Sequence, residues 1–282
     1  MDRIFKRFGK DDLKEFEPEA KVGIIATVNP DGLPHVTLIT ALQARSETEL
    51  IWGQFCEGRS KQHVKENPKT GFLIMTMDRS LWRGKALWSR EARQGDDYAM
   101  FNMKPMFRYN AYTGIHTVHY MDLVETYGRE KLPLLKIVLS SLLTRMAKSV
   151  PAARRQERIM NPWTEGLFNR LDTVKFLSYV DSDGFPVVIP LVQCQASDNR
   201  RLSFSPMAYS RELKALDKGM PLAVFGLTLD MEDVLVRGIF AGYGKYRGIT
   251  LGCVDVDWVY NSMPPLHGQI YPHREIMPVT DF

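Results

Sequence analysis

The chain has 282 residues, of which 44% are hydrophobic and 25% are charged, and its net charge is +4. This composition is typical of a folded globular protein and excludes a disordered or fibrous chain. The small net charge gives no indication of nucleic-acid binding. No apolar run reaches the roughly 18 residues of a membrane span.

The cysteines and the N-terminal residues give an indication of the cellular compartment in which the protein works. Cys56, Cys194 and Cys253 are odd in number and far apart, so we expect buried small side chains and not a disulfide framework. The first residues contain no apolar signal region. We therefore expect a cytoplasmic protein.

The first predicted elements are two strands joined by a tight turn. An apolar and β-branched run from Val22 leads into residues 29–32, Asn-Pro-Asp-Gly, and a second strand is predicted over 36–44. Asn at the first position, Pro at the second and Gly at the fourth are typical of a type I turn closed by a glycine bulge. Further strands are predicted over 50–55, 71–77 and 82–88, and a short helix is predicted over 59–66, ended by Asn67-Pro68.

A helical linker is predicted to follow, ending near Leu171. Within 132–146 the apolar residues recur at helical spacing and form one stripe: Leu135, Val138, Leu139, Leu142, Leu143 and Met146. We expect this stripe to pack on a barrel or on a second subunit, and a membrane-surface helix is the alternative. Residues 129–171 carry nine Lys or Arg and three acids, a net charge of +6, so the rest of the chain sums to −2. This excess of positive charge predicts either a solvated helical face or a basic patch that binds an anionic ligand or an acidic neighbouring surface.

An internal repeat organises the rest of the chain. Residues 22–34 match residues 174–186 at an offset of 152, and after a two-residue insertion Arg83-Gly84 aligns with Arg237-Gly238. The sequence therefore predicts a tandem duplication. The expected organisation is mainly β, with one β unit over 1–127, a basic helical linker over 128–171 and a second β unit over 172–282.

The segment Arg59-Ser60-Lys61 is the strongest candidate for a binding site. It follows a predicted strand and opens a short helix, where free backbone N–H groups and the helix dipole favour an anion. An arginine fork, a hydroxyl and a lysine charge suit a phosphate group. A solvated basic turn is the alternative interpretation.

The order of these motifs resembles the pyridoxamine 5′-phosphate oxidase-like family of FMN-binding split β-barrels. The motifs are Asp31-Gly32-Leu33-Pro34, the Arg59 segment, Glu66-Asn67-Pro68 and Arg83-Gly84. The resemblance implies two split β-barrels and FMN as cofactor. The cofactor-binding residues that it implies are Thr37, Gln54, Arg59, Ser60, Lys61 and Arg83.

The resemblance further implies an FMN-dependent oxidoreductase with an unidentified small-molecule substrate and electron donor. The alternative is a non-catalytic carrier or sensor that binds FMN or haem, and a deazaflavin would fit the same kind of site. Pyridoxamine phosphate oxidation itself is not expected, because the tail over 266–274 lacks the arginine and histidine pattern of the true oxidases.

The second copy departs from the first at the predicted phosphate site. Glu212 replaces Ser60 and Leu213 replaces Lys61, and a carboxylate repels a phosphate at close range. We expect the second barrel to have lost its site and to cover the flavin of the first. A homodimer of such chains is a further expectation.

Other candidate residues carry weaker signals. His116 and His119 fall in a predicted strand, where residues three apart face opposite sides, so we expect no metal site. The aromatic run over 105–112, with Arg108 and Tyr109, is expected to be a packed loop or a wall of the flavin pocket. Tryptophans Trp52, Trp82 and Trp88 are expected in the core.

Overall fold

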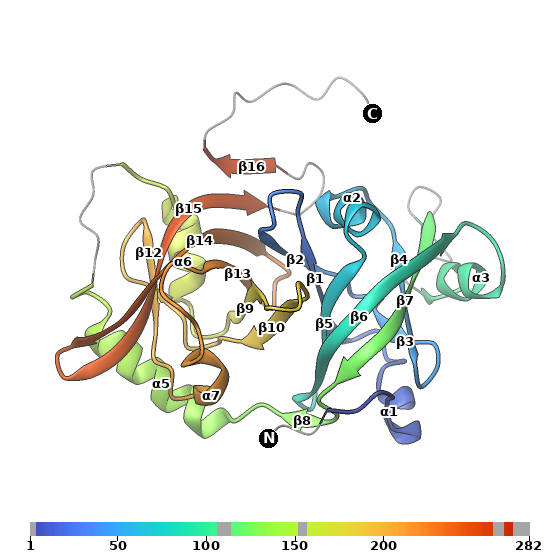
Figure 1. The fold of residues 1–282 in the computed structure, drawn as a ribbon, viewed down its shortest axis with the longest axis horizontal. Coiled ribbons are helices and arrows are strands. Elements are labelled where there is room, and N and C mark those ends of the chain that lie inside the picture. The colour runs from blue at the N-terminus through green and yellow to red at the C-terminus, as the bar shows by residue number, and fades with distance from the viewer. Residues whose placement is uncertain (1–3, 106–113, 152–156, 262–267, 273–282) are drawn as a thin grey trace. The chain divides into compact units, whose positions relative to one another are not determined.

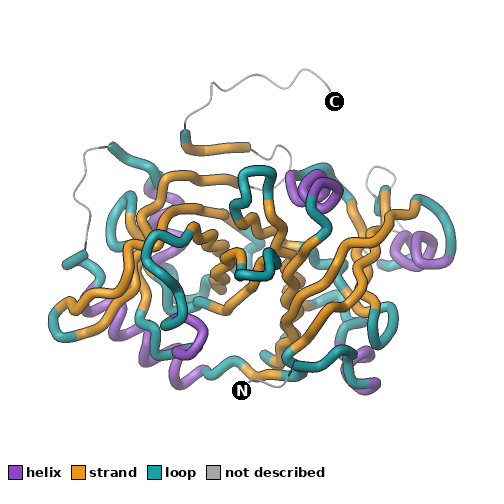
Figure 2. The backbone as a smooth tube through the Cα atoms, viewed as in Figure 1, coloured by secondary structure: helices purple, strands orange, loops and turns teal. Residues whose placement is uncertain are grey.

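The computed structural model describes residues 4–105, 114–151, 157–261 and 268–272. Contacts divide the chain into two units, which are described separately: residues 1–132 with 178–188, and residues 133–177 with 189–282. The linker predicted over 128–171 thus contributes to the second unit from residue 133 onward. Strands predominate in both units (Figure 2).

Within its described residues, unit 1 contains one antiparallel sheet of eight strands and three helices, α1 to α3 (Figure 1). Its strand order is β2-β1-β5-β6-β7-β4-β3, and β8 pairs with β6. The elements are α1 (Lys10–Glu15), β1 (Lys21–Val28), β2 (Pro34–Leu38), β3 (Gln43–Ala44), β4 (Glu49–Gln54), α2 (Arg59–Glu66), β5 (Lys69–Thr76), β6 (Ser80–Ala92), α3 (Asp96–Asn102), β7 (Thr117–Thr126) and β8 (Glu130–Lys131).

The second sheet also has eight strands and repeats the same order, β10-β9-β13-β14-β15-β12-β11, with β16 paired to β15. Its elements, with the helices of unit 2, are α5 (Leu134–Ala147), α6 (Pro162–Asn169), β9 (Val174–Val180), β10 (Pro186–Pro190), β11 (Gln195–Ala196), β12 (Arg201–Phe204), α7 (Ser210–Leu213), β13 (Pro221–Leu227), β14 (Asp233–Tyr246), β15 (Ile249–Asn261) and β16 (Gly268–Tyr271). The identical strand order confirms the predicted duplication and the predicted mainly β fold.

The predicted hairpin turn is present in both copies. Gly32 has a φ of 76° and donates its N–H to the carbonyl of Asn29 at 2.9 Å. Gly184 has a φ of 80° and donates to the carbonyl of Asp181 at 2.8 Å. Glycine adopts this left-handed conformation without a Cβ penalty, which explains why both copies end the turn with it.

The Arg-Gly pair of each copy marks a close approach of two strands. A Cβ on Gly84 would lie 1.9 Å from the carbonyl oxygen of Glu125, and one on Gly238 would lie 2.0 Å from that of Asp255. The strand pairing shifts register close to both glycines. The recurrence of these glycines is therefore structural.

The strand predicted over 36–44 is interrupted in the structure. β2 ends at Leu38, and the chain turns before β3, with the N–H of Leu42 bonded to the carbonyl of Ile39 at 3.0 Å. The backbone of Ile39 lies so close to β1 that a Cβ on Gly23 would be 2.2 Å from its carbonyl oxygen. This break therefore depends on a contact with a distant glycine.

The core of unit 1 is aromatic. Trp52 and Trp82 are buried in it, as predicted, and the partly buried Trp88 packs against it. Phe16 contacts the Trp82 ring edge-on, with 4.9 Å between ring centroids. This core fixes the strands that carry the candidate site.

The helix α5 packs with the face opposite to the predicted one. Its buried residues are Ile137, Ser140, Thr144 and Ala147. The backbone N–H of Ser205 donates to Thr144 Oγ1 at 2.9 Å, and the N–H of Ala208 donates to Ser140 Oγ at 3.2 Å. The predicted packing of the leucine stripe on a barrel is therefore not found among the described residues. No described helix is both long enough and apolar enough to cross a membrane.

Candidate functional site

The predicted helix over 59–66 is present as α2, and it ends before Asn67-Pro68 as expected. It lies against β1 and β2 in unit 1 (Figure 1). Its buried residues are Ser60, Lys61, His63 and Val64. Three of these four are polar, so α2 presents mainly hydrogen-bonding groups to β1 and β2.

A layer of polar side chains fills the space between α2 and the two strands. Ser60 Oγ and Thr37 Oγ1 lie 2.7 Å apart, and either hydroxyl is able to donate. Thr27 Oγ1 lies 3.1 Å from His63 Nδ1. The ring of His35 contacts that of His63 edge-on at 5.1 Å. The structure thus brings two of the predicted site residues, Thr37 and Ser60, into direct contact.

Lys61 is a buried cation that lacks a close acidic partner. Lys61 is only 6% exposed, and this burial lowers the pKa of its ammonium group. Electrostatic interactions with Cys56 and Glu57 offset part of that shift. Among the residues that the structure describes, no hydrogen bond or ion pair reaches Lys61 Nζ. An uncompensated buried charge is costly, so this arrangement favours an anionic ligand.

The preceding glycine makes room for the lysine. A Cβ on Gly58 would lie 3.3 Å from Lys61 Nζ, so the ammonium group folds back over the start of its own helix. The free N–H groups of a helix start and the positive end of the helix dipole favour negative charge at the same place. Charge and dipole therefore act together at the beginning of α2.

A small cavity lies beside this helix start. Its volume is about 80 Å³, and it is lined by Gln54, Glu57, Lys61, Gln62, Lys65, Glu91, Arg93, His116 and Thr117. Lys65 Nζ pairs with Glu91 at 3.0 Å. Pockets for whole small molecules measure roughly 300–1,000 Å³, so this cavity suits an anionic group and not a ring system. Two of the predicted site residues, Gln54 and Lys61, line it together.

A chain of hydrogen bonds leads from the core to this cavity. The indole N–H of Trp88 donates to His119 Nδ1 at 3.1 Å, so the imidazole carries its proton on Nε2. Nε2 then donates to Gln54 Oε1 at 2.8 Å, and Gln54 Nε2 donates to Glu57 at 2.9 Å. Each bond fixes the direction of the next, and together they hold the Gln54 amide in one orientation.

The imidazole of His119 is held in its neutral form. It stacks on Trp52 with 3.9 Å between ring centroids and an interplanar angle of 8°. Burial lowers the pKa of His119 from 6.5 to about 3. Protonation would also remove the Nδ1 acceptor that the Trp88 indole uses, so a charged His119 is incompatible with the hydrogen-bond chain.

We expect His119 to make the fold acid-sensitive. Between pH 6.5 and about 3 the unfolded chain binds a proton that the folded imidazole does not. The free energy of unfolding therefore falls with decreasing pH, by up to about 1.4 kcal/mol per pH unit. Urea unfolding of wild type and His119→Gln at pH 4, 5, 6 and 7 measures this slope, which should be shallower in the variant. His116→Gln, at an exposed histidine, is the control, and equal slopes in all three proteins would contradict the assignment.

The two predicted arginines occupy different environments. Arg59 opens α2 beside Ser60 and Lys61. Arg83 is 2% exposed, donates to Glu130 at 2.7 and 3.1 Å, and lies over the Tyr127 ring at 5.0 Å. Its guanidinium is thus held by a bidentate ion pair within unit 1, and a role for Arg83 in cofactor binding stays a prediction.

Sequence reasoning missed the buried polar layer and the hydrogen-bond chain. Thr27 and His35 are direct partners in the β1–β2 register. Polar residues at 27, 35 and 37 therefore share one strand face, a signal that the alternation of the two strands already contained. The stacking of His119 on Trp52 had no local signal, although these residues are also register partners, in β4 and β7.

Three further predictions concern the surroundings of the site. His119 lies in β7 as expected, but His116 lies just before that strand, against the prediction, and lines the cavity. No cluster of metal-binding side chains is found in the described part of the chain. Arg108 and Tyr109 lie outside the described residues. In the second copy α7 is a single turn in which Glu212 and Leu213 stand at the positions of Ser60 and Lys61.

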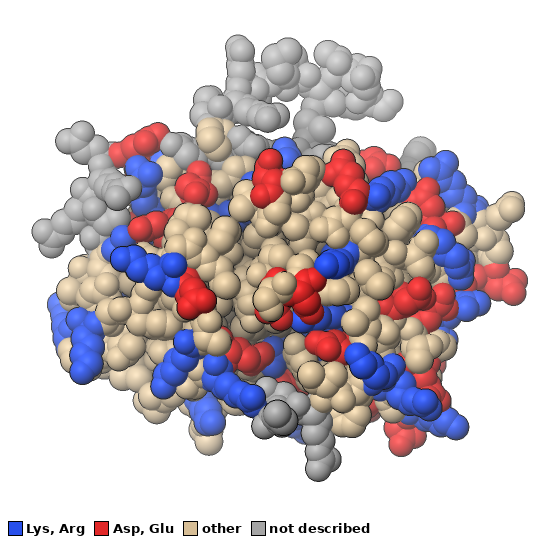
Figure 3. All heavy atoms as spheres, in the orientation of Figure 1, with Lys and Arg blue, Asp and Glu red and all other residues tan. Residues whose placement is uncertain are grey.

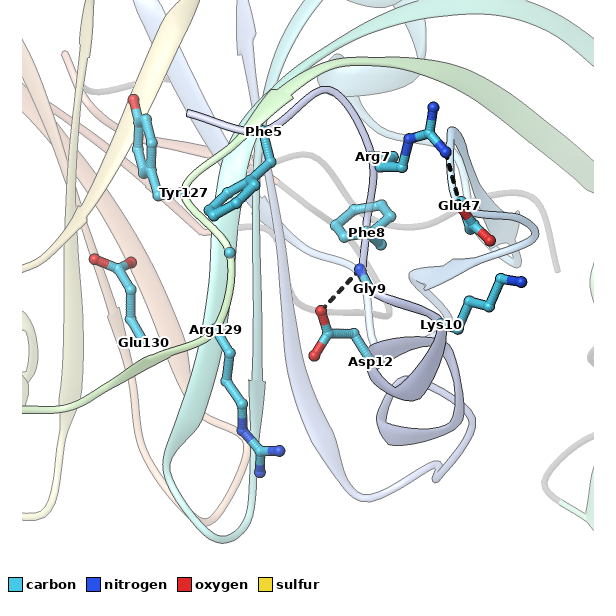
Figure 4. Close-up of a pocket in the computed structure, with 11 residues that line it drawn as sticks. Phe5, Arg7, Phe8, Gly9, Lys10, Asp12, Glu47, Tyr127, Arg129 and Glu130 are labelled. Atoms are coloured by element: carbon cyan, nitrogen blue, oxygen red, sulfur yellow. Dashed lines mark hydrogen bonds and ion pairs between the residues drawn. The ribbon is translucent and has the colours of Figure 1, made fainter. Parts of the chain in front are cut away.

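Unit 1 has a second, larger hollow of about 770 Å³, between the N-terminal segment and the turn after β7 (Figure 4). Several of its polar groups have partners of their own. Arg7 pairs with Glu47 at 3.7 Å, and the N–H of Gly9 donates to Asp12 at 3.0 Å. None of the predicted cofactor-binding residues lines it, so it is not our candidate site.

Comparison with known protein families gives a match within the first half of the chain. The family model for pyridoxamine 5′-phosphate oxidase matches residues 10–117. No curated protein sequence matches the chain. Similar solved structures include HupZ of Group A Streptococcus, at 14% identity over 42% of this chain and 87% of that one, with a TM-score of 0.34.

Two further similar structures cover the same share of the chain. A putative pyridoxamine 5′-phosphate oxidase of Lactobacillus delbrueckii is 15% identical over 43% of this chain and 94% of that one, with a TM-score of 0.35. An FMN-binding protein of Syntrophomonas wolfei is 15% identical over 42% of this chain and 85% of that one, with a TM-score of 0.33.

Proposed function

We propose that this chain binds FMN in its first copy of the repeat and is a flavin-dependent oxidoreductase of the pyridoxamine 5′-phosphate oxidase-like family, because the model of that family matches residues 10–117. One observation supports the proposal above the others. Lys61 is a buried ammonium at the start of α2, without a hydrogen bond or ion pair in the described part of the chain. A phosphate monoester supplies the negative charge that this position lacks.

The donor set around Lys61 fits a phosphate group. Lys61 offers its charge, the first turn of α2 offers backbone N–H groups, and Arg59 opens the same turn. Ser60 and Thr37 share one hydrogen bond, so one of the two hydroxyl protons stays available for a phosphate oxygen. The small cavity accommodates a group of this size and leaves a ring system outside it.

The bound flavin supplies the redox chemistry, since its ring accepts and returns electrons with protons, and the protein positions it. This chain's own residues have three tasks. Lys61 and Ser60 hold the anionic end. His119 keeps the Gln54 amide in a fixed orientation at the rim of the cavity. Burial of His119 in neutral form keeps an extra positive charge away from Lys61.

The proposal is tested by comparing two ligands that differ only in the phosphate. The full-length protein is titrated with FMN and with riboflavin, and binding is followed by flavin fluorescence and visible absorption. We expect one FMN per chain and an affinity for FMN at least about tenfold higher than for riboflavin, because charge-assisted hydrogen bonds contribute about 1.5–3 kcal/mol. Equal affinities would exclude a phosphate site at α2, and absence of FMN binding would contradict the whole proposal.

A measurement of flavin turnover distinguishes an enzyme from a non-catalytic carrier. With FMN bound, a reduced nicotinamide should bleach the flavin bands, and an added acceptor should restore them. A flavin that binds at one equivalent and is never bleached by any donor would indicate a carrier or sensor instead.

A further inference from the structure

The surface helix α5 of unit 2 exposes its apolar residues to solvent. Leu135 is 89% exposed, Met146 62% and Val138 57%, while Leu139 and Leu142 are also about half exposed. The helix is anchored by its opposite face, through Ser140 and Thr144. A row of exposed leucines on an anchored helix is uncommon in a globular protein and marks an interaction surface.

The charges of α5 and of the adjoining β14–β15 turn are of one sign. Within α5 the charged residues are Lys136 and Arg145, both exposed, and the helix contains no acid. Arg247, in the turn between β14 and β15, donates to the carbonyl of Met146 at 3.1 Å and so lies at the end of α5. Lys245 precedes it in the same hairpin. The stripe is therefore flanked by cations.

A hollow of about 430 Å³ adjoins the stripe. Leu143 of α5 forms one wall, and Met207 and Ile249 add apolar surface. Lys214, Ser210 and Thr250 provide a cation and two hydroxyls at the same place. In Figure 3, Lys and Arg side chains, with tan side chains and a few Asp or Glu side chains between them, occupy the lower left of the view, where Figure 1 shows α5, α7 and the β14–β15 turn. The short helix α7 also carries an acid, Glu212.

We propose that α5 binds an anionic lipid surface, with its leucine stripe in the interfacial layer and its flanking cations at the lipid phosphates. This is the manner in which amphipathic helices lie in the plane of a membrane. Charge complementarity favours this partner over a second copy of the chain. Two copies meeting through α5 would bring Lys136 and Arg145 onto a surface whose helix has no acid to pair with them.

The test is co-sedimentation of the full-length protein with vesicles. We expect binding to vesicles of equal parts phosphatidylglycerol and phosphatidylcholine, and much weaker binding to phosphatidylcholine alone. Leu135→Glu and Leu139→Glu should each reduce the bound fraction at least about tenfold. Arg145→Gln should reduce it about fivefold on anionic vesicles and hardly at all on neutral ones.

Matched controls keep the test decisive. Leu229 is 75% exposed in the turn after β13, also in unit 2, so Leu229→Glu should bind vesicles as wild type does. Because the substituted side chains lie on the surface, circular dichroism and thermal unfolding should be unchanged in all variants. Absence of vesicle binding by the wild type would overturn the proposal, and so would equal loss in the Leu229 variant.

The same variants also test whether a second copy of the chain, and not a lipid surface, covers the leucine stripe. If the wild type forms a dimer that Leu135→Glu dissociates, and does not bind vesicles, then α5 is a subunit interface and the lipid proposal is wrong. The measurement is made on the protein with and without FMN, and the expected result is the same in both. Failure of flavin binding therefore does not affect this test.

Discussion

Substitution of Lys61 by methionine should weaken FMN binding and, at the same time, stabilise the protein without FMN. The loss of a charge-assisted contact to phosphate lowers the affinity about 10- to 100-fold, which corresponds to about 1.5–3 kcal/mol. Methionine keeps an unbranched side chain that is one atom shorter and removes the buried charge, which burial disfavours, as the lowered pKa of Lys61 indicates. A residue that only maintains the fold would not produce these opposite effects.

The stabilisation should also depend on pH in a defined direction. The pKa of Lys61 is lowered in the folded protein, so between that pKa and 10.5 the unfolded chain binds more protons. The free energy of unfolding of the wild type therefore rises as the pH approaches 10.5. The difference between wild type and Lys61→Met should be largest near neutral pH and shrink in alkaline solution.

Isothermal titration with FMN and urea unfolding without ligand measure the two effects of this substitution. Lys14→Met, at an exposed lysine of α1, is the control and should change neither. A Lys61→Met protein with unchanged FMN affinity and reduced stability would show that Lys61 supports the fold and not the ligand.

Substitution of Gly84 by alanine should unfold unit 1. The new Cβ would lie 1.9 Å from the backbone carbonyl oxygen of Glu125, in the neighbouring strand β7. Backbone atoms of a paired strand cannot move aside as a flexible side chain does, so we expect a loss of more than about 3 kcal/mol. Gly238→Ala should have the same effect in unit 2, since its Cβ would lie 2.0 Å from the Asp255 carbonyl oxygen.

The control for this prediction is a glycine with free space around it. Gly166 lies in α6, is exposed, and a Cβ there would meet no atom within 4 Å. Gly166→Ala should therefore stabilise the protein by about 0.5–1 kcal/mol, because alanine is the better helix former. Yields of folded protein and urea unfolding curves compare the three variants, and a Gly84→Ala protein as stable as the wild type would contradict the close strand approach.

The local features of this protein could be predicted from its sequence. The turn at 29–32 and its copy at 181–184 follow from residues that prefer those backbone angles. The helix over 59–66 ends where Asn67-Pro68 prevents its continuation. Detection of the repeat required only a comparison of the sequence with itself. These features depend on neighbours in the chain, so sequence was sufficient.

The features that depend on contacts between distant residues could not be predicted in this way. The interruption at Ile39 requires the approach of its backbone to Gly23 in another strand. The face on which α5 packs is decided by Ser140 and Thr144, whose hydroxyl oxygens accept from the backbone N–H groups of residues 208 and 205, respectively. Hydrophobic periodicity indicates an apolar face but not its partner, so the sequence left a barrel, a second subunit and a membrane surface open as partners of the stripe.

The candidate site combines both kinds of information. The sequence by itself determined which residues begin α2, and that a hydroxyl, a lysine and a helix start suit an anion. Only the tertiary structure decided that Lys61 is buried without a close counter-charge, and that His119 is neutral and orients Gln54. Burial and hydrogen-bond partners come from strands far apart in the chain, and the pKa of a group depends on those surroundings more than on its neighbours in sequence.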